Sequence, residues 1–157
     1  VESGTYGGIP LGVVDFGAAI KPQAIIGHPQ QMDFYNGGGV NITFMGAGQI
    51  DRNGDVNVSL LGGRAVGVGG FMDITDGARK ICFLISAAGR HQKFVDGVDQ
   101  VSFSSTRALA RGKQVFLASE YYVLEFTDAG WRVIHTLDTP EADQAVAAIQ
   151  FVLGANE

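Results

Sequence analysis

The chain has 157 residues, 46% of them hydrophobic, and a mean hydropathy of +0.15, a composition typical of one folded domain and not of a disordered segment. Its formal net charge is −5 at pH 7 and its basic residues form no cluster, which argues against a nucleic-acid partner. The single cysteine, Cys82, excludes an internal disulfide, suits the cytoplasm and is expected to be buried and inert. No apolar run has the length of a membrane span.

Glycine is concentrated in the first half of the chain, where seventeen of the 23 glycines lie within residues 1–70. Glu2 sits among them, in the N-terminal stretch VESGTYGG. Slim, flexible backbone around a carboxylate lets a large ligand come close to it, whereas an acidic residue near a terminus is commonly just solvated. These residues alone leave both interpretations of Glu2 open.

Two strands are predicted next, over 40–45 and 56–60, because apolar and polar residues alternate there and many are β-branched. A turn at 52–55, which contains Asn-Gly, lies between them. The stretch GGRAVGVGG at 62–70 is too rich in glycine for a regular element and predicts a loop. The continuous apolar run at 79–86 then predicts a strand that is buried on both faces.

The second half of the chain carries the clearer secondary-structure signals. Short strands are predicted over 99–103 and 114–120, and a β-hairpin over 121–137. A C-terminal helix is predicted over 139–153, with Thr139 as its cap and an apolar stripe along one side. Strands mixed with flanking helices in this way predict a single α/β domain with an open sheet across all 157 residues.

Most common catalytic motifs are missing from the chain. His28, His91 and His135 are too far apart to form a ligand-spaced pair, so no metal site is predicted. The stretch GRAVGVGG lacks the Lys-Ser/Thr ending of a phosphate-binding loop, and no Gly-x-Ser-x-Gly motif is present. The clusters of glycine remain, and they fit either several tight turns or a groove floor whose N–H groups meet a large ligand.

Five stretches in order carry a family resemblance over residues 1–105: VESGTYGGIPLG, DFGAAI, QMDFYNGGG, GAGQIDRNGDVNVS and GVGGFMDIT. Together they resemble the β half of family I coenzyme A transferases, and most of all the short-chain acyl and propionate/acetate CoA-transferases, which are related to the 3-oxoacid CoA-transferases. Two later stretches, KFVDGVDQVSF and EYYVLEF, extend the likeness. The resemblance implies the open-sheet α/β fold of that half.

The resemblance also implies a catalytic role for Glu2, because the family's nucleophile is a glutamate in a Glu-x-Gly motif followed by glycines. The implied reaction moves CoA between short-chain carboxylic acids by a ping-pong mechanism, through an acyl-glutamyl anhydride and a glutamyl-CoA thioester. By the same resemblance, Gly69 and Gly70 are the expected oxyanion donors and CoA contacts. Asn36 and Gln49 are expected to offer side-chain amides.

Three further residues are expected to line the substrate pocket: Gly37, Gly38 and Val68. Related enzymes often have cysteine at the position of Val68. The resemblance implies that coenzyme A is a substrate and that no cofactor or metal is needed.

The family pairs this half with an α half that carries much of the CoA site, and neither that half nor the start of the β half is in this sequence. The chain is therefore expected to form the C-terminal part of a β half and to be active only with an α-type part. Val1 is expected to contact polypeptide outside this sequence. A homo-oligomer in the cytoplasm, working in short-chain fatty acid, ketone body or acyl-CoA metabolism, is expected. A thioester hydrolase on the same scaffold and a non-catalytic binding domain remain alternatives.

Overall fold

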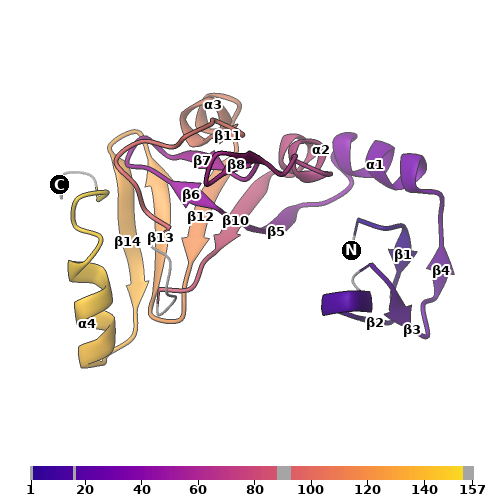
Figure 1. Ribbon diagram of the computed structural model, residues 1–157, viewed down its shortest axis with the longest axis horizontal. Helices are drawn as coiled ribbons and strands as arrows, with labels where there is room; N and C mark the ends of the chain where they lie inside the picture. Colours follow the sequence, from indigo (N-terminus) through magenta and orange to yellow (C-terminus); the bar gives the residue numbers. More distant parts are fainter. Residues whose placement is uncertain (1, 16, 88–92, 154–157) are drawn as a thin grey trace.

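The computed structural model describes residues 2–15, 17–87 and 93–153, and its centre is a five-stranded sheet (Figure 1). Three neighbouring strands are parallel and the remaining two are antiparallel, in the order β14-β13-β12-β10-β5. The α/β class with an open sheet is therefore confirmed. The strands are β5 (Ile42–Gly46), β10 (Lys80–Leu84), β12 (Gln114–Ala118), β13 (Tyr122–Thr127) and β14 (Gly130–Thr136).

Burial along each strand follows its position in the sheet. The central strand β10 is the continuous apolar run, and Ile81, Cys82 and Phe83 are all buried. In β13, alternate residues such as Leu124 and Phe126 are buried and their neighbours are half-buried. The strand predicted over 79–86 is confirmed over Lys80–Leu84, although only Ile81–Phe83 are buried and both end residues are exposed. The hairpin at 121–137 and the buried thiol are also confirmed. Burial also raises the pKa of the Cys82 thiol.

One face of the sheet carries the hydrophobic core. Side chains of β10 and β12 on this face pack with Phe71 and Ala108 from two helices and with Ile50 and Val56 from a second, small sheet. The covering elements are α2 (Phe71–Gly77), α3 (Ser105–Ala110), β6 (Gln49–Ile50), β7 (Asp55–Asn57) and β11 (Phe103–Ser104).

The opposite face of the sheet is open near the edge strand β5. The register places Ile42 and Phe44 beside Lys80 and Cys82 of β10, on the face that points away from the core. Ile42 is 44% and Phe44 60% exposed, and Leu84 on the same face is 49% exposed. Apolar side chains therefore remain in contact with solvent along this edge.

The described N-terminal residues up to Ile25 form a small lobe that stands apart from the sheet and joins it through helix α1 (Figure 1). Glycines at the turns take left-handed backbone angles there, for example Gly7 with φ of 68°. Helix α1 packs against α2, and their contact is so close that a methyl group on Gly77 would lie 1.6 Å from the carbonyl oxygen of Tyr35. The elements are β1 (Thr5–Tyr6), β2 (Ile9–Pro10), the 3-10 helix η1 (Val13–Asp15), β3 (Ala19–Ile20), β4 (Ala24–Ile25) and α1 (His28–Asn36).

Three short predictions from the sequence need correction. The strand predicted over 56–60 ends at Asn57, because the Asn57 side chain bonds to the next turn and closes it. The loop predicted over 62–70 begins instead with a tight hairpin, in which β8 (Leu60–Leu61) pairs with β9 (Arg64–Ala65). Of the strand predicted over 99–103, only the last residue lies in a strand, which is β11 (Phe103–Ser104). The sequence pattern also does not predict helices α1, α2 and α3.

The C-terminal helix begins where it was predicted but is shorter. Helix α4 spans Pro140–Ala147, and the hydroxyl of Thr139 accepts a hydrogen bond from the N–H of Ala142, as expected of a cap. The predicted extension to 153 is wrong: the chain turns after Ala147, which lets Val152 pack in the core near Trp131. Within the described residues, no helix is long and apolar enough to cross a membrane.

Tyr122 gives the fold a testable dependence on alkaline pH. Burial raises the pKa of Tyr122 to about 12, against about 10 for an exposed tyrosine. The folded chain holds the Tyr122 proton more tightly than the unfolded chain does. The contribution of this group to the free energy of unfolding is therefore complete below about pH 10, and it is lost as the pH rises toward the folded-state pKa of about 12. In thermal unfolding series across this window, Tyr122→Phe should lose less stability than the unaltered chain. If the stability of the two proteins depended on pH in the same way, Tyr122 would not be the cause of the loss at alkaline pH.

Candidate active site

Glu2 is positioned by contacts that fasten the residues directly after it. The N–H of Ile26 donates to the carbonyl oxygen of Gly4 at 2.9 Å, and the hydroxyl of Ser3 donates to the carbonyl oxygen of Gly17. Gly4 has φ of 92°, and a methyl group there would lie 2.2 Å from the carbonyl oxygen of Ile26. Glycine is therefore required at this position, and the half-buried Glu2 side chain extends from a well-held segment.

The loop Val66–Gly70 lies opposite Glu2, between the β8–β9 hairpin and helix α2. Two of its glycines, Gly67 and Gly69, have left-handed φ angles of 82° and 54°. In the part of the chain that the structure describes, the N–H groups of Val68, Gly69 and Gly70 donate no hydrogen bond. Three consecutive backbone donors are thus available to an anionic ligand atom.

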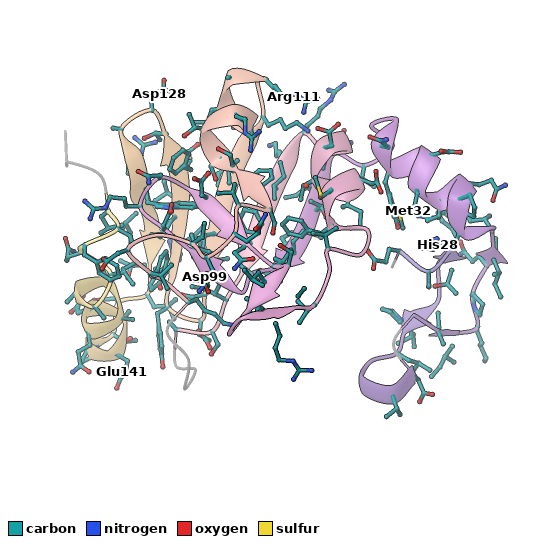
Figure 2. All side chains as sticks on the ribbon, turned by 45° about the horizontal axis from the view of Figure 1, so that its top comes forward. His28, Met32, Asp99, Arg111, Asp128 and Glu141 are labelled. Atoms are coloured by element: carbon teal, nitrogen blue, oxygen red, sulfur yellow. The ribbon has the colours of Figure 1, made fainter. Side chains whose placement is uncertain are left out.

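The carboxylate of Glu2 comes very close to this loop. A methyl group on Gly70 would lie 2.7 Å from Oε2 of Glu2, and one on Gly69 would lie 3.8 Å from Oε1. Met32 of α1, labelled in Figure 2, would be 3.1 Å from the methyl group on Gly70. Gly70 has an ordinary φ of −80°, so the close approach explains the glycine better than its backbone angle does. The fold therefore brings Glu2, Gly69 and Gly70 together.

A cavity of about 600 Å³ opens beside Glu2. Strand β5 forms one wall, and Val68, Phe71 and Ile74 form another. The lining is mainly apolar, and Glu2 is the only charged side chain that the described residues contribute to it. An apolar space that ends at a carboxylate suits an extended ligand whose reactive end reaches Glu2.

Gln49 is not part of this cavity. Its Nε2 donates to Oδ2 of Asp99 at 2.9 Å, and its Oε1 accepts hydrogen bonds from the side chain of Asn57 and the N–H of Asp99. The amide expected to contact substrate is therefore already engaged with protein groups. Sequence reasoning did not find Asn57, which is fully buried, because it occupies an ordinary polar position of the alternating strand pattern and so gave no signal.

Asn36 and the glycines after it lie at the C-terminal end of α1. Asn36 lines a second cavity, of about 400 Å³, on the side of α2 that faces α3. The N–H of Gly37 donates to the carbonyl oxygen of Asp33, and Gly38, with φ of 83°, turns the chain toward β5. None of the three lines the cavity beside Glu2. Their roles in CoA and substrate contact stay predictions.

Comparison with known proteins gives consistent results. The chain is 32% identical over 155 residues to caffeate CoA-transferase of Acetobacterium woodii, across 85% of this chain and 30% of that protein. It is 27% identical over 106 residues to one subunit of the 3-oxoadipate CoA-transferase of Pseudomonas knackmussii, across 60% and 40% of the two chains. The crystal structure of the Escherichia coli O157:H7 acyl-CoA transferase YdiF, in a thioester complex with CoA, matches with a TM-score of 0.83 at 26% identity, over 96% of this chain and 31% of YdiF. No family model matches the chain.

This chain belongs to the family I coenzyme A transferases. The likeness to their β half, inferred from the glycine-rich stretches, is thereby confirmed. The chain spans less than a third of the length of the first curated relatives that it matches.

The second cavity of this coenzyme A transferase chain has charged groups, but they mainly hold α2 in place. Arg111, labelled in Figure 2, forms an ion pair with Asp76 and holds the pKa of that carboxyl below its usual value. The ammonium group of Lys113 donates to the carbonyl oxygens of Thr75, Asp76 and Ala78. Burial lowers the pKa of Lys113. These cations therefore stabilise the C-terminal end of α2.

No metal-binding cluster accompanies the site in the described chain. Among residues 2–15, 17–87 and 93–153, no group of three or more His, Cys, Asp or Glu side chains could hold a metal ion. His91 and Val1 lie outside the described residues.

Proposed function

We propose that this chain supplies the nucleophile and the oxyanion donors of an acyl-CoA:carboxylate CoA-transferase. The observation that carries the proposal is the position of the Glu2 carboxylate against a loop whose N–H groups at Val68, Gly69 and Gly70 make no hydrogen bond in the described chain. A carboxylate nucleophile and preorganised backbone donors are what thioester exchange between carboxylic acids requires.

In the proposed reaction, a Glu2 oxygen attacks the carbonyl carbon of the acyl-CoA, and the C–S bond breaks to release CoA thiolate. The resulting acyl-glutamyl anhydride is attacked by that thiolate at the glutamyl carbonyl. This step forms the glutamyl-CoA thioester and releases the first carboxylate. An acceptor carboxylate then reverses the same steps, so that CoA leaves on a new acid.

Each attack produces a tetrahedral oxyanion, and the N–H groups of Gly69 and Gly70 are proposed to stabilise it. The cavity beside Glu2, with Val68 in its wall, would take the extended thioester end of the ligand. Asn36, Gly37 and Gly38 would contact the substrate farther from the reacting atoms. Coenzyme A acts here as substrate, and no other cofactor is proposed.

An α-type partner is proposed to complete the site. The 3-oxoadipate relative is named as one subunit of its enzyme, which indicates a second subunit there. The N-terminal lobe exposes several large apolar side chains, Tyr6 at 64%, Ile9 at 65% and Ile25 at 74%. Exposed apolar groups gathered in one place are typical of protein interfaces.

We further propose a cytoplasmic oligomer that acts on short-chain acids in fatty acid, ketone body or other acyl-CoA metabolism.

The first prediction is that the 157-residue chain does not transfer CoA when it is alone. The α-type part is proposed to complete the site, so without it water can reach the reacting thioester, and nothing holds the substrate within a fraction of an ångström of its attack geometry. Incubation with acetyl-CoA and propionate should yield no propionyl-CoA by mass spectrometry. Addition of the α-type polypeptide should restore exchange.

The same assay separates the transferase from its alternatives. A thioester hydrolase would release free CoA and acetate at a rate that does not depend on propionate. A binding domain would retain acetyl-CoA without turnover even in the assembled protein. Full transferase activity of the isolated chain would show that the account of an incomplete site is wrong.

A further inference from the structure

Asn57 is a buried polar residue that no part of the proposed chemistry uses. It is fully buried at the end of β7, where a polar side chain needs all of its hydrogen bonds. Its Nδ2 donates to Oε1 of Gln49 and to the carbonyl oxygen of Leu60, each at 2.6 Å. Its Oδ1 accepts from the N–H groups of Ser59 and Leu60, at 3.0 and 3.1 Å. Both amide hydrogens and both acceptor positions are therefore occupied.

These bonds fix the turn from Asn57 to Leu60, and that turn holds the beginning of the loop opposite Glu2. The carbonyl oxygen of Ser59 accepts hydrogen bonds from the N–H of Val66 at 2.8 Å and from the N–H of Gly67 at 3.3 Å. The next N–H groups along the chain are the unused ones. Asn57 thus lies two hydrogen bonds away from the proposed oxyanion donors.

The turn is itself fastened to the rest of the small sheet. Gln49 accepts from Asn57 and is bound in turn to Asp99, which is labelled in Figure 2. The hydroxyl of Ser102 lies 2.9 Å from that of Ser59, and it accepts from the N–H of Val58. The position of the turn is consequently set by several elements, and not by its own sequence alone.

We infer that Asn57 is a positioning residue: through the Ser59 carbonyl oxygen it sets where the Val68–Gly70 donors lie relative to Glu2. The glycines of the loop have no side chains to hold it, so its placement depends on the Ser59 bonds at one end and on α2 at the other. Asn57 does not line the cavity beside Glu2. The catalytic consequence rests on the proposed function, whereas the effect on the loop does not.

The test replaces the Asn57 amide by a group of the same shape. Asn57→Asp removes both donated bonds, to Gln49 and Leu60, and leaves the shape of the side chain unchanged. Hydrogen exchange of the Val66 and Gly67 amides, followed by NMR, should become at least tenfold faster, while the amides of β10 keep their protection. The matched control is Asn53→Asp, an exposed turn position whose side chain forms no hydrogen bond in the described chain. It should leave loop exchange unchanged.

In the assembled transferase, Asn57→Asp should lower kcat about 100-fold and leave KM for the acyl-CoA within about twofold, because a displacement near 1 Å costs on that order. If Asn57→Asp does not fold, Gln49→Glu provides the test, since it keeps the acceptor for Asn57 but places a carboxylate beside Asp99. In Gln49→Glu, a rise in the exchange rates of the Val66 and Gly67 amides that is smaller than tenfold supports the inference. Unchanged exchange in a folded variant overturns it, even if Glu2 is the nucleophile. Faster exchange without any loss of kcat removes the catalytic consequence.

Discussion

Glu2→Gln in the assembled enzyme should lower CoA transfer by at least about 10³-fold, because an amide cannot form the acyl anhydride. With acyl-CoA and no acceptor acid, the unaltered enzyme should accumulate the thioester. The peptide that contains Glu2 should then gain the mass of CoA less one water. Borohydride should reduce the thioester to the alcohol, and Glu2→Gln should show neither change.

Glu2→Asp is the informative companion to that variant. It keeps the charge but withdraws the carboxylate from Gly70 by one methylene, so it should form the adduct far more slowly than the unaltered enzyme. Thermal unfolding should be nearly the same for all three proteins, since Glu2 takes part in no ion pair within the described chain and is not fully buried. A CoA adduct on any other residue would show that Glu2 is not the nucleophile.

Gly70→Val is expected to have the second-largest effect. A Cβ at this position would lie 2.7 Å from Oε2 of Glu2 and 3.1 Å from Cε of Met32, so the carboxylate and the loop must separate. Loss of an oxyanion donor lowers turnover by roughly 10²–10³-fold, and we expect a decrease of that size in kcat. Steady-state kinetics of CoA transfer measure it directly.

Stability distinguishes this effect from a general disturbance of the fold. Gly70 has φ of −80°, an angle that valine also adopts, so the melting temperature should change little. Gly97→Val is a suitable control, because its backbone is not left-handed and a methyl group there meets no atom within 4 Å. That control should keep full activity. A Gly70 variant that loses stability in proportion to its activity would show that the glycine serves the backbone instead of the reaction.

The sequence predicted those parts of the fold in which local pattern and final environment agree. The apolar run of β10 becomes a central buried strand, and the hairpin β13–β14 alternates as expected. Thr139 caps α4 because capping depends only on neighbouring residues. The sequence did not predict helices α1 and α2, because both are short and begin next to glycines. Their packing against each other stabilises them more than their intrinsic helix propensity does.

For the candidate site, the sequence by itself determined the family and singled out Glu2, because glycine-rich motifs keep their order along the chain. The resemblance placed Gly69 and Gly70 in the same site as Glu2, but only the tertiary structure decided how closely these groups approach each other. Glu2 and Gly70 come together only after the sheet, α1 and α2 have packed, and no spacing rule predicts that approach. The sequence also led us to expect that the Gln49 amide contacts substrate, but in the fold this amide binds Asn57 and Asp99. Hydrogen bonds of buried side chains depend on distant segments, so residue type and spacing do not specify them.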